Sequence, residues 1–503
     1  MKFQKILITL VFSAVYTLGF AQADRCGTDQ SDAFMESIRE NKKSFEATRN
    51  KARVERFIPI QFHNVGTTQG EGRVNDKDIL KALCLLNERY VGTEMRFYSV
   101  GINYLDNTNV NDNPGGNQAR TAMADAKNPA ALNIFIVSDA GTGVAGYYTR
   151  NLDIVVVRKN TLSDDRYTLE HELGHFFSLA HTHRGWDQIA NGPGVEQGGY
   201  DPMIHGDTVT IASVSSSQSG STLIELMDMS NCTTAADEIC DTPPDYGFGF
   251  SCSCCRMIYD VWDRNGDKIE PMIDNVMSYS NGCDPYRFSE GQVTAMHTDF
   301  DSNRRAYLRT NEVDQYTPIT EEATILSPAG SEWEEFNGVL FDWEDVPNAE
   351  SYLVKIDGAL NEQFITTESE LYLEILEADA TYFWFVTPVS KFGASCGAEE
   401  VRIFTTGSGT TGLDEIENIT NYSISPNPST TGNDIRVFLT SEINMDAAVS
   451  IIDISGKVVL TQNENLNSGI NKITVESASL ISGLYIIQIE TEAGKITDKL
   501  LIK

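Results

Sequence analysis

Basic residues are scarce in this chain. Its 503 residues include 38 lysines and arginines against 72 aspartates and glutamates, which gives a formal net charge of -34. DNA and RNA need a basic face opposite their phosphates, so this balance argues against a nucleic-acid partner. A strongly acidic surface suits a soluble extracellular protein, and its carboxylate-rich loops can hold calcium.

Long apolar runs are also lacking. The run from Ile6 to Phe20 is too short to span a bilayer once the protein is mature, and no other segment approaches 18 apolar residues. Lys2 and Lys5 precede this run and the small residues of Ala21-Gln22-Ala23 follow it, which is the pattern of a secretory signal peptide. We therefore predict export from the cytoplasm and no transmembrane helix.

Cysteine is present in an odd number, nine, and six of the nine lie between positions 232 and 283. This usage fits an oxidising compartment, and at least one cysteine must stay outside the intrachain disulfides. The paired CxxC spacing of a zinc ribbon is missing. Histidine is rarer still, with seven in the chain, yet four of the seven fall within positions 171–183.

His171 and His175 lie four residues apart, so a helix would present both imidazoles on one face, one turn apart. Glu172 stands between them and could take a proton from a water that a bound metal activates. This HExxH pattern predicts a zinc site for hydrolysis. A catalytic zinc needs a third protein ligand, which His181 or His183 could supply.

The zinc helix has a predicted start and end. Ser163 and Asp164 can cap a helix that begins near Asp165. A straight helix would carry position 181 away from the face of His175, so the chain must break after Phe177. Two β-branched runs upstream, 133–137 and 152–157, predict strands.

The spacing of His171, His175 and His181 resembles the HExxHxxGxxH pattern of metzincin zinc proteases. Ser178 stands where the family has glycine, and a residue other than glycine costs roughly 1 kcal/mol at the positive φ of that turn. Metzincins also have a methionine turn below the zinc, and the segment from Asn275 to Tyr279 resembles it. The resemblance implies that Met277 forms the base of the site and that Tyr279 stabilises the oxyanion.

Further motifs narrow the resemblance to the pappalysin branch of metzincins, over residues 25–310. These motifs are Arg25-Cys-Gly-Thr28, Leu132-Asn-Ile-Phe135, Cys240-Asp-Thr-Pro243, Cys283 and Arg287-Phe-Ser-Glu-Gly-Gln292.

The pappalysin resemblance implies three further features. Cys26 would act as a latency switch that fills the open zinc position of a zymogen, although a disulfide is an equal alternative. Calcium would bind in the catalytic domain; the segment 263–267 has alternating oxygen ligands, but Asn265-Gly266 favours a hairpin there. Asp284 would select Arg or Lys after the scissile bond, or it caps a turn beside Pro285.

The chain turns all-β from about Thr317. Alternating runs predict strands, and the stretch resembles a fibronectin type III module with Trp343, Tyr352, Tyr382 and Trp384 as core aromatics. The final region contains a Ser-Pro-Asn-Pro start, a hairpin at 453–457 and an apolar end. It resembles the sorting domain of cargo for the type IX secretion machinery of Gram-negative bacteria.

The expected fold is an α+β metzincin catalytic domain, with a twisted sheet, a zinc helix and a loop-rich lower half, followed by two all-β sandwich-like domains. We expect the protein to be a secreted or cell-surface zinc endopeptidase that is exported through the periplasm and acts on protein or peptide substrates. Two rivals remain: a gluzincin-like peptidase with a downstream glutamate ligand, and an adhesin with a decayed protease domain. The predicted bounds are signal peptide 1–23, pro-segment 24–55, catalytic domain 56–312, fibronectin type III-like domain 318–406, linker 407–420 and sorting domain 421–503.

Overall fold

The computed structural model divides the chain into two compact units. The first contains residues up to 52, 63–73 and 103–308, and the second contains 53–62, 74–102 and 309–503. No helix among the described residues is long and apolar enough to cross a membrane. The predicted signal peptide, Cys252, Cys254 and the predicted helix cap at Ser163 and Asp164 lie outside the described residues. The structure describes residues 25–48, 53–162, 167–186, 205–216, 219–247, 255–257, 260–280, 282–310, 313–330, 333–334, 338–407, 417–427, 429, 431–453, 456–478 and 480–502.

A six-stranded mixed sheet has the strand order β1-β5-β6-β4-β2-β3. The predicted strand at 133–137 is β4, and the one predicted at 152–157 is β6, which begins two residues later than expected. All six residues of β4 are buried, which explains why its sequence is a continuous apolar run. The strands are β1 (Arg25–Cys26), β2 (Arg56–Gly66), β3 (Met95–Asp106), β4 (Leu132–Val137), β5 (Val144–Thr149) and β6 (Ile154–Arg158).

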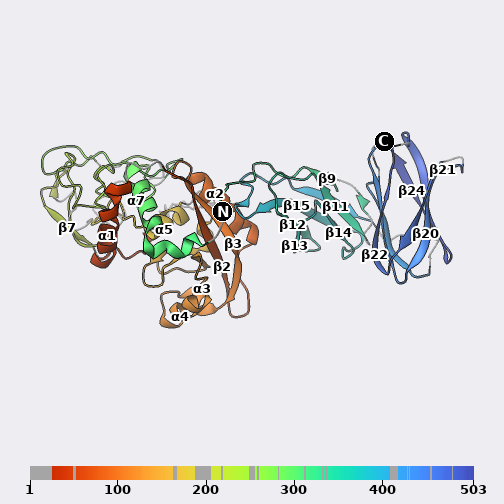
Figure 1. Cartoon of the computed structure of the whole chain (residues 1–503), viewed down its shortest axis with the longest axis horizontal. Helices are drawn as coiled ribbons and strands as arrows, with labels where there is room; N and C mark the ends of the chain where they lie inside the picture. Colours follow the sequence, from red (N-terminus) through yellow and green to blue (C-terminus); the bar gives the residue numbers. More distant parts are fainter. Residues whose placement is uncertain are drawn as a thin grey trace, which may run out of the picture. The chain divides into compact units, whose positions relative to one another are not determined.

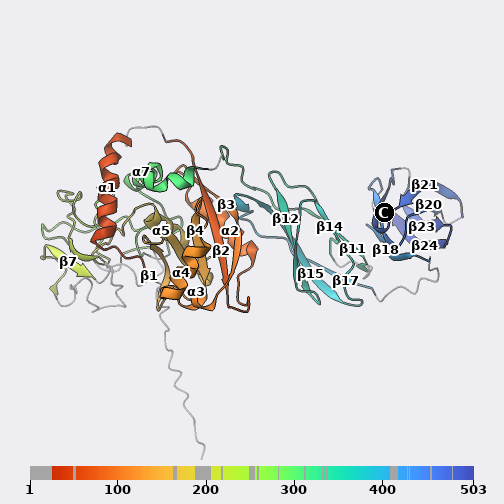
Figure 2. The same cartoon turned by 60° about the horizontal axis from the view of Figure 1, so that its bottom comes forward.

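The polar stretch from Ser37 to Arg49 predicts a helix, and the structure begins this helix, α1, five residues earlier, at Asp32. The Ser31 carbonyl accepts the first N–H bonds of this helix, and the buried Phe34 and Met35 add apolar contact to its first turn. Helices α1 and α7 contact one another (Figure 2). The helices are α1 (Asp32–Thr48), α2 (Asp76–Arg89), α3 (Thr108–Asp112), α4 (Asn117–Ala126), α5 (Thr168–Phe176) and α7 (Glu290–Asp301), with 3-10 turns at Lys159–Thr161 and Asn303–Arg309.

The helix α5 carries the HExxH motif and begins at Thr168, three residues after the predicted start. It ends at Phe176, and the chain reverses at Ser178, whose φ is 66°. The predicted break after Phe177 is therefore confirmed, and Ser178 adopts the left-handed conformation that favours glycine.

The part of the first unit between α5 and α7 is rich in loops (Figure 1). Its described strands are the short pair β7 (Ser213–Ser216) and β8 (Gly220–Leu223). Two disulfides, Cys232–Cys240 and Cys255–Cys283, close loops in this region and replace the hydrogen-bond ladders that regular structure would provide.

Two sandwiches of β-strands form most of the second unit. The first consists of a sheet ordered β10-β17-β15-β12-β13 and a second sheet ordered β14-β11-β9. Trp343, Tyr352, Tyr382 and Trp384 are all buried in its core, as predicted. Its strands are β9 (Ile325–Ser327), β10 (Trp333–Glu334), β11 (Val339–Trp343), β12 (Ser351–Gly358), β13 (Glu362–Thr366), β14 (Glu370–Leu373), β15 (Thr381–Ser390), β16 (Gly393–Ala394) and β17 (Arg402–Thr406).

The second sandwich has sheets ordered β18-β19-β22 and β21-β20-β23-β24. Its first strand begins at Ile419, inside the range expected to be linker. Elsewhere in the same unit a disulfide joins Cys84 of α2 to Cys396, across 312 positions of sequence. The strands are β18 (Ile419–Ser425), β19 (Ile435–Ser441), β20 (Met445–Asp453), β21 (Val458–Leu466), β22 (Gly469–Val475), β23 (Gly483–Thr491) and β24 (Gly494–Ile502).

Candidate metal centre

Three histidine side chains converge in the first unit. The Nε2 atom of His181 lies 3.1 Å from Nε2 of His171 and 3.1 Å from Nε2 of His175. A tetrahedral zinc with bonds of about 2.0–2.1 Å would separate its nitrogen ligands by about 3.3 Å. The observed separations are thus close to the spacing that one small metal ion needs, and all three rings are buried.

The opposite ring nitrogens fix how two of these rings are oriented. His171 Nδ1 donates to the Val276 carbonyl at 2.8 Å, and His175 Nδ1 donates to the Leu179 carbonyl at 2.7 Å. A carbonyl oxygen only accepts, so each Nε2 of these neutral rings carries a lone pair toward the other rings. Burial holds the pKa of both rings well below the usual range, which keeps them neutral, as metal ligands must be. The donor set therefore fits zinc.

Glu172 lies beside this cluster and is fully buried. Burial raises the pKa of its carboxyl to about 7, although hydrogen bonds from Cys26 and Thr28 act in the opposite direction. Its Oε2 accepts from the Thr28 hydroxyl at 2.8 Å, while Oε1 has no hydrogen-bond partner among the described residues. A buried carboxyl that titrates near neutral pH can take up and return a proton.

Cys26 provides a fourth potential ligand. Its thiol and one nitrogen from each of His171, His175 and His181 all lie within 4.8 Å of one another. The thiol is 3.5 Å from Glu172 Oε2, and burial followed by the Glu172 charge raises its pKa well above the usual range. The pairing of β1 with β5 holds this segment along the edge of the sheet.

Two more predicted site residues lie next to the histidines. The Tyr279 ring centroid is 4.8 Å from that of His181, and its hydroxyl accepts from the Cys26 N–H at 3.2 Å. Met277 is buried below α5, where a Cβ atom at Gly174 would come within 2.3 Å of its sulfur. Gly174 thus allows the methionine to approach α5.

His183 does not belong to the cluster of potential ligands within the described residues. Its ring stacks on that of His181 with centroids 4.6 Å apart and an angle of 10°. The Asp245 carboxylate lies 4.0 Å from its Nδ1. The geometry therefore brings His181, and not His183, to the two helical histidines.

Asp284 is exposed and accepts a hydrogen bond from the Tyr167 hydroxyl at 3.4 Å. The adjacent Cys283 is tied to Cys255 by a disulfide, which holds this loop. Whether Asp284 selects a substrate side chain stays a prediction.

The segment 263–267 forms the hairpin turn that its Asn-Gly pair favours. Asp263 Oδ1 accepts the N–H groups of Asn265 and Asp267, at 2.8 and 2.9 Å, and the Asp263 N–H reaches the Asp267 carbonyl at 2.8 Å. The buried carboxylate is thus satisfied by backbone N–H groups. Calcium elsewhere in the unit stays a prediction.

Sequence reasoning missed several residues of the N-terminal segment that contact the site. Gln30 is buried; its amide oxygen accepts the His181 N–H at 2.8 Å, and its amide nitrogen lies against His181 Nδ1. Thr28 bonds Glu172, and Asn41 bonds the Ser178 hydroxyl at 3.0 Å. Uncharged polar residues in a polar segment carry no local signal for such distant partners.

Comparisons with known proteins give separate matches for different parts of the chain. Residues 423–503 match the family of secretion system C-terminal sorting domains. The C-terminal region is a secretion sorting domain. The predicted type IX sorting domain is thereby confirmed, and it indicates export to a secreted or cell-surface location.

A search of curated proteins finds no match. Among solved structures, a promirolysin mutant from Tannerella forsythia is similar over 58% of this chain and 100% of its own, with 17% identity and a TM-score of 0.36. Mature mirolysin from the same bacterium, in complex with a cleaved peptide, is similar over 53% and 100%, with 16% identity and a TM-score of 0.34. The structure of FN3tt is similar over 18% and 100%, with 15% identity and a TM-score of 0.16.

Proposed function

We propose that the protein is a secreted zinc-dependent endopeptidase of the pappalysin-like metzincin type. The observation that carries this proposal is the convergence of three buried imidazole nitrogens, at 3.1 Å, beside the buried carboxyl of Glu172. His171, His175 and His181 would hold the zinc. When bound, zinc supplies Lewis acidity, which makes water a nucleophile and polarises a peptide carbonyl.

The residues around the metal would handle protons and charge. Glu172 takes the proton from the attacking water and later delivers it to the leaving amine, a role that suits its buried carboxyl, whose Oε1 has no hydrogen-bond partner among the described residues. The Tyr279 hydroxyl is released when Cys26 leaves, and it then donates to the oxygen of the scissile carbonyl as negative charge develops there. Met277 supports the site from below α5.

The segment 24–55 would keep this site latent. Cys26 lies within ligand distance of the three histidines, and a thiol that binds zinc loses its proton. In that state it fills the position that the attacking water needs, while the Thr28 hydroxyl of the same segment donates to Glu172 Oε2. Removal of the segment would open the site. Structural calcium in the first unit belongs to the same proposal.

The test is hydrolysis of casein and of an internally quenched peptide by the purified chain after removal of residues 24–55. Full activity should need zinc and should be lost with Glu172→Ala. A matched variant, Glu170→Ala, changes the neighbouring buried glutamate of the same helix and keeps the cluster of ligands. Proteolysis that persists in Glu172→Ala would contradict the proposal.

Latency has a separate test. Cys26→Ala should make the uncleaved chain measurably active, because the fourth ligand is gone while the three histidines remain. Cys26→Ser is the milder control, since a hydroxyl is a poorer zinc ligand than a thiolate. An uncleaved Cys26→Ala chain as inert as the wild type would show that the thiol does not maintain latency.

A further inference from the structure

Helix α1 contacts the turn that carries His181 at a residue where this chain departs from the metzincin pattern. Asn41 Nδ2 donates to the Ser178 hydroxyl at 3.0 Å and to Asp299 Oδ1 at 2.8 Å. Ser178 Oγ itself donates to the same Asp299 oxygen at 2.9 Å. Because a carboxylate only accepts, these three groups form a closed set in which each proton has an acceptor.

Ser178 is unusual for its conformation as well as its contacts. Its φ of 66° would favour glycine, and its side chain is buried. Glycine could form the turn but could not accept from Asn41. The strain that serine introduces is therefore accompanied by a contact to the N-terminal segment that glycine would lack.

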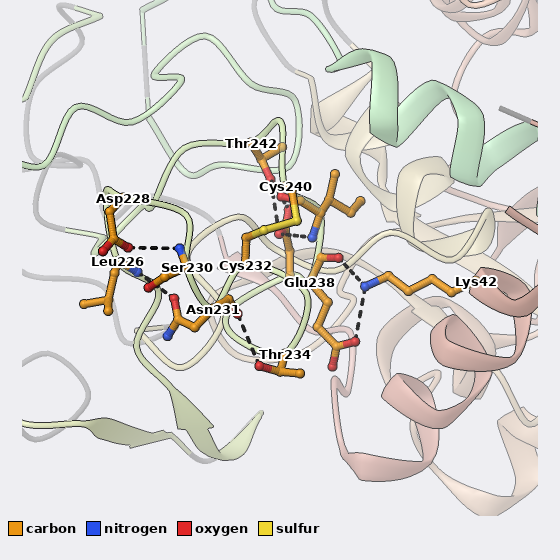
Figure 3. The surroundings of a disulfide bond; sticks show 12 residues. Lys42, Leu226, Asp228, Ser230, Asn231, Cys232, Thr234, Glu238, Cys240 and Thr242 are labelled. Carbon is orange, nitrogen blue, oxygen red and sulfur yellow. Dashed lines mark hydrogen bonds and ion pairs between the residues drawn. A yellow bond between two sulfur atoms is a disulfide. The ribbon is translucent and has the colours of Figure 1, made fainter. Parts of the chain in front are cut away.

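A second contact is made by two residues of α1 that flank Asn41 in the sequence. Arg39 donates to Glu238 Oε1 from Nε at 3.0 Å and from Nη2 at 2.8 Å, and Lys42 lies 3.3 Å from Glu238 Oε2. The Glu238 side chain is only 3% exposed. Figure 3 shows Lys42 directed toward this carboxylate. The disulfide between Cys232 and Cys240 lies beside it and closes the loop that contains Glu238.

The Lys42 ammonium also acts electrostatically on two further carboxyl groups. Burial raises the pKa of Glu225 and of Asp237, and the positive charge of Lys42 lowers both. Glu225 is buried, and its Oε1 has no hydrogen-bond partner among the described residues. With α1 in place, the nearly buried Glu238 carboxylate thus has two cationic partners, both of which belong to α1.

We propose that Ser178, Asp299 and Glu238 form a binding surface, here called the latch surface, that retains the pro-segment after its peptide bond to the rest of the chain is cut. The partner is the cleaved segment 24–50 of this chain, recognised through Asn41, Arg39 and Lys42. The proposal rests on the proposed function for the meaning of activation. Cleavage alone leaves an inhibited complex, and activity appears when the segment dissociates. The cut leaves the contacts of α1 in place. It removes only the covalent tether, and with it the high effective concentration of the segment at the latch surface.

Dilution separates cleavage from release. A specific protease site is inserted between Asn50 and Lys51 of the full chain, and the chain is cut to completion at micromolar concentration. Two measurements follow: co-elution of the N-terminal fragment in size-exclusion chromatography, and peptidase activity per molecule over a thousandfold dilution. The latch surface predicts co-elution, and it predicts specific activity that rises on dilution with a midpoint at the dissociation constant. An uncut sample should stay inactive at every concentration.

Variants on α1 test the named contacts, and they leave the mature enzyme unchanged because α1 is removed from it. Asn41→Ala and Lys42→Gln should each raise the midpoint concentration about tenfold or more, since each removes a hydrogen bond to a charged group. Lys43→Gln is the matched control: it changes a lysine one position away that is exposed, and it should leave the midpoint unchanged.

Combining Asn41→Ala with Ser178→Gly tests their direct contact. The two changes together should raise the midpoint by clearly less than the product of their separate effects, because each removes the same hydrogen bond. If the double variant instead raises the midpoint by the full product of the two separate effects, the proposed role of Ser178 is overturned. If a variant chain fails to fold, synthetic peptides 24–50 with the same substitutions are added to the dissociated wild-type protein, and inhibition is compared directly.

The two proposals fail in different ways. A cut chain that is fully active at all concentrations, with a separately eluting fragment, would overturn the latch surface and leave the endopeptidase proposal intact. A fragment that co-elutes and responds to Asn41→Ala, in a protein without peptidase activity at any dilution, would uphold the surface and contradict the enzyme.

Discussion

The first unit and the β-sandwiches of the second unit bury different kinds of side chain. The core around Trp343 and Trp384 is formed by aromatic and aliphatic groups on alternating strand positions. The first unit buries charged groups as well: Arg305 is fully buried, with bonds to Asp153 at 2.6 Å and Asp299 at 2.8 Å. Apolar burial specifies a fold with many tolerable substitutions, whereas a buried charge requires particular partners.

Arg305 illustrates why the first unit retains such groups. Its guanidinium carbon lies 3.6 Å from the centre of the Phe176 ring, at the end of α5, and its Nη2 donates to the Phe176 carbonyl. Asp299 uses one oxygen for Arg305 and the other for Ser178. The buried ion pairs therefore hold the turn between His175 and His181, so their specificity helps to position the converging histidines.

The largest expected effect is on export, and it depends on the sorting domain alone. Deleting residues 421–503 should leave the protein in the periplasm, because the signal that the secretion machinery reads is gone. Immunoblots of medium, surface and periplasmic fractions measure this, with the cut-and-diluted activity of the truncated chain as control. Normal release of the truncated protein would contradict an export role.

Glu172→Gln should lower kcat on a quenched peptide by about 10²–10⁴-fold, the usual contribution of general acid–base catalysis. The melting temperature should not fall, since the change replaces a buried carboxyl with an uncharged group of similar shape. Steady-state kinetics and calorimetry on one preparation measure both quantities. A parallel loss of kcat and stability would mean that Glu172 is structural.

Trp384→Ala and Arg305→Met compare the two kinds of burial directly. Each should cost about 3–5 kcal/mol of unfolding free energy in its own unit, the first through a cavity and the second through unpaired carboxylates. Only Arg305→Met should also reduce zinc retention. Calorimetry and metal analysis measure the two effects. Zinc loss in Trp384→Ala would break the distinction between the units.

Asp284→Ala should weaken a preference for Arg or Lys after the scissile bond by about 1.5–3 kcal/mol, the value of a hydrogen bond to a charged group. The comparison is between kcat/KM for peptides with Lys and with Leu at that position. Mass-spectrometric mapping of cleavage in a mixed peptide library provides the profile. A wild-type profile dominated by apolar residues after the cut would end this proposal.

Acid should weaken the first unit through Asp153. Burial acts to raise the pKa of this carboxyl, but Arg305 and Arg304 lower it to about 2, below its ordinary value of 3.8. The depressed pKa contributes about 2 kcal/mol above pH 4, and this contribution is lost as the pH falls toward 2. Denaturant unfolding between pH 5 and 2 should show a steeper loss in the wild type than in Asp153→Asn. Equal slopes would count against the ion pair.

Much of the local structure could be predicted from the sequence because it depends on near neighbours. The spacing of His171 and His175 requires a helix, and the need for a third ligand predicted the break after Phe177. Alternation predicted the strands around Trp343 and Tyr382, since each strand has one buried face. In each case a short pattern corresponds to one physical requirement.

The remaining features depend on distant partners. The Cys84–Cys396 disulfide joins residues 312 positions apart, and no spacing rule connects them. Polar residues of α1 meet Ser178 and Glu238 across 137 and 196–199 positions. The start of α1 at Asp32 instead of Ser37 reflects packing of its first turn, which a polar sequence does not reveal.

The most direct test of the metal centre is zinc content by mass spectrometry in purified wild type, His181→Ala and His183→Ala. The pair is matched, because the two rings stack on one another and differ in whether a nitrogen reaches the helical histidines. We predict one zinc per chain in the wild type and in His183→Ala, and strong loss in His181→Ala. Full zinc in His181→Ala, or loss only in His183→Ala, would contradict the account.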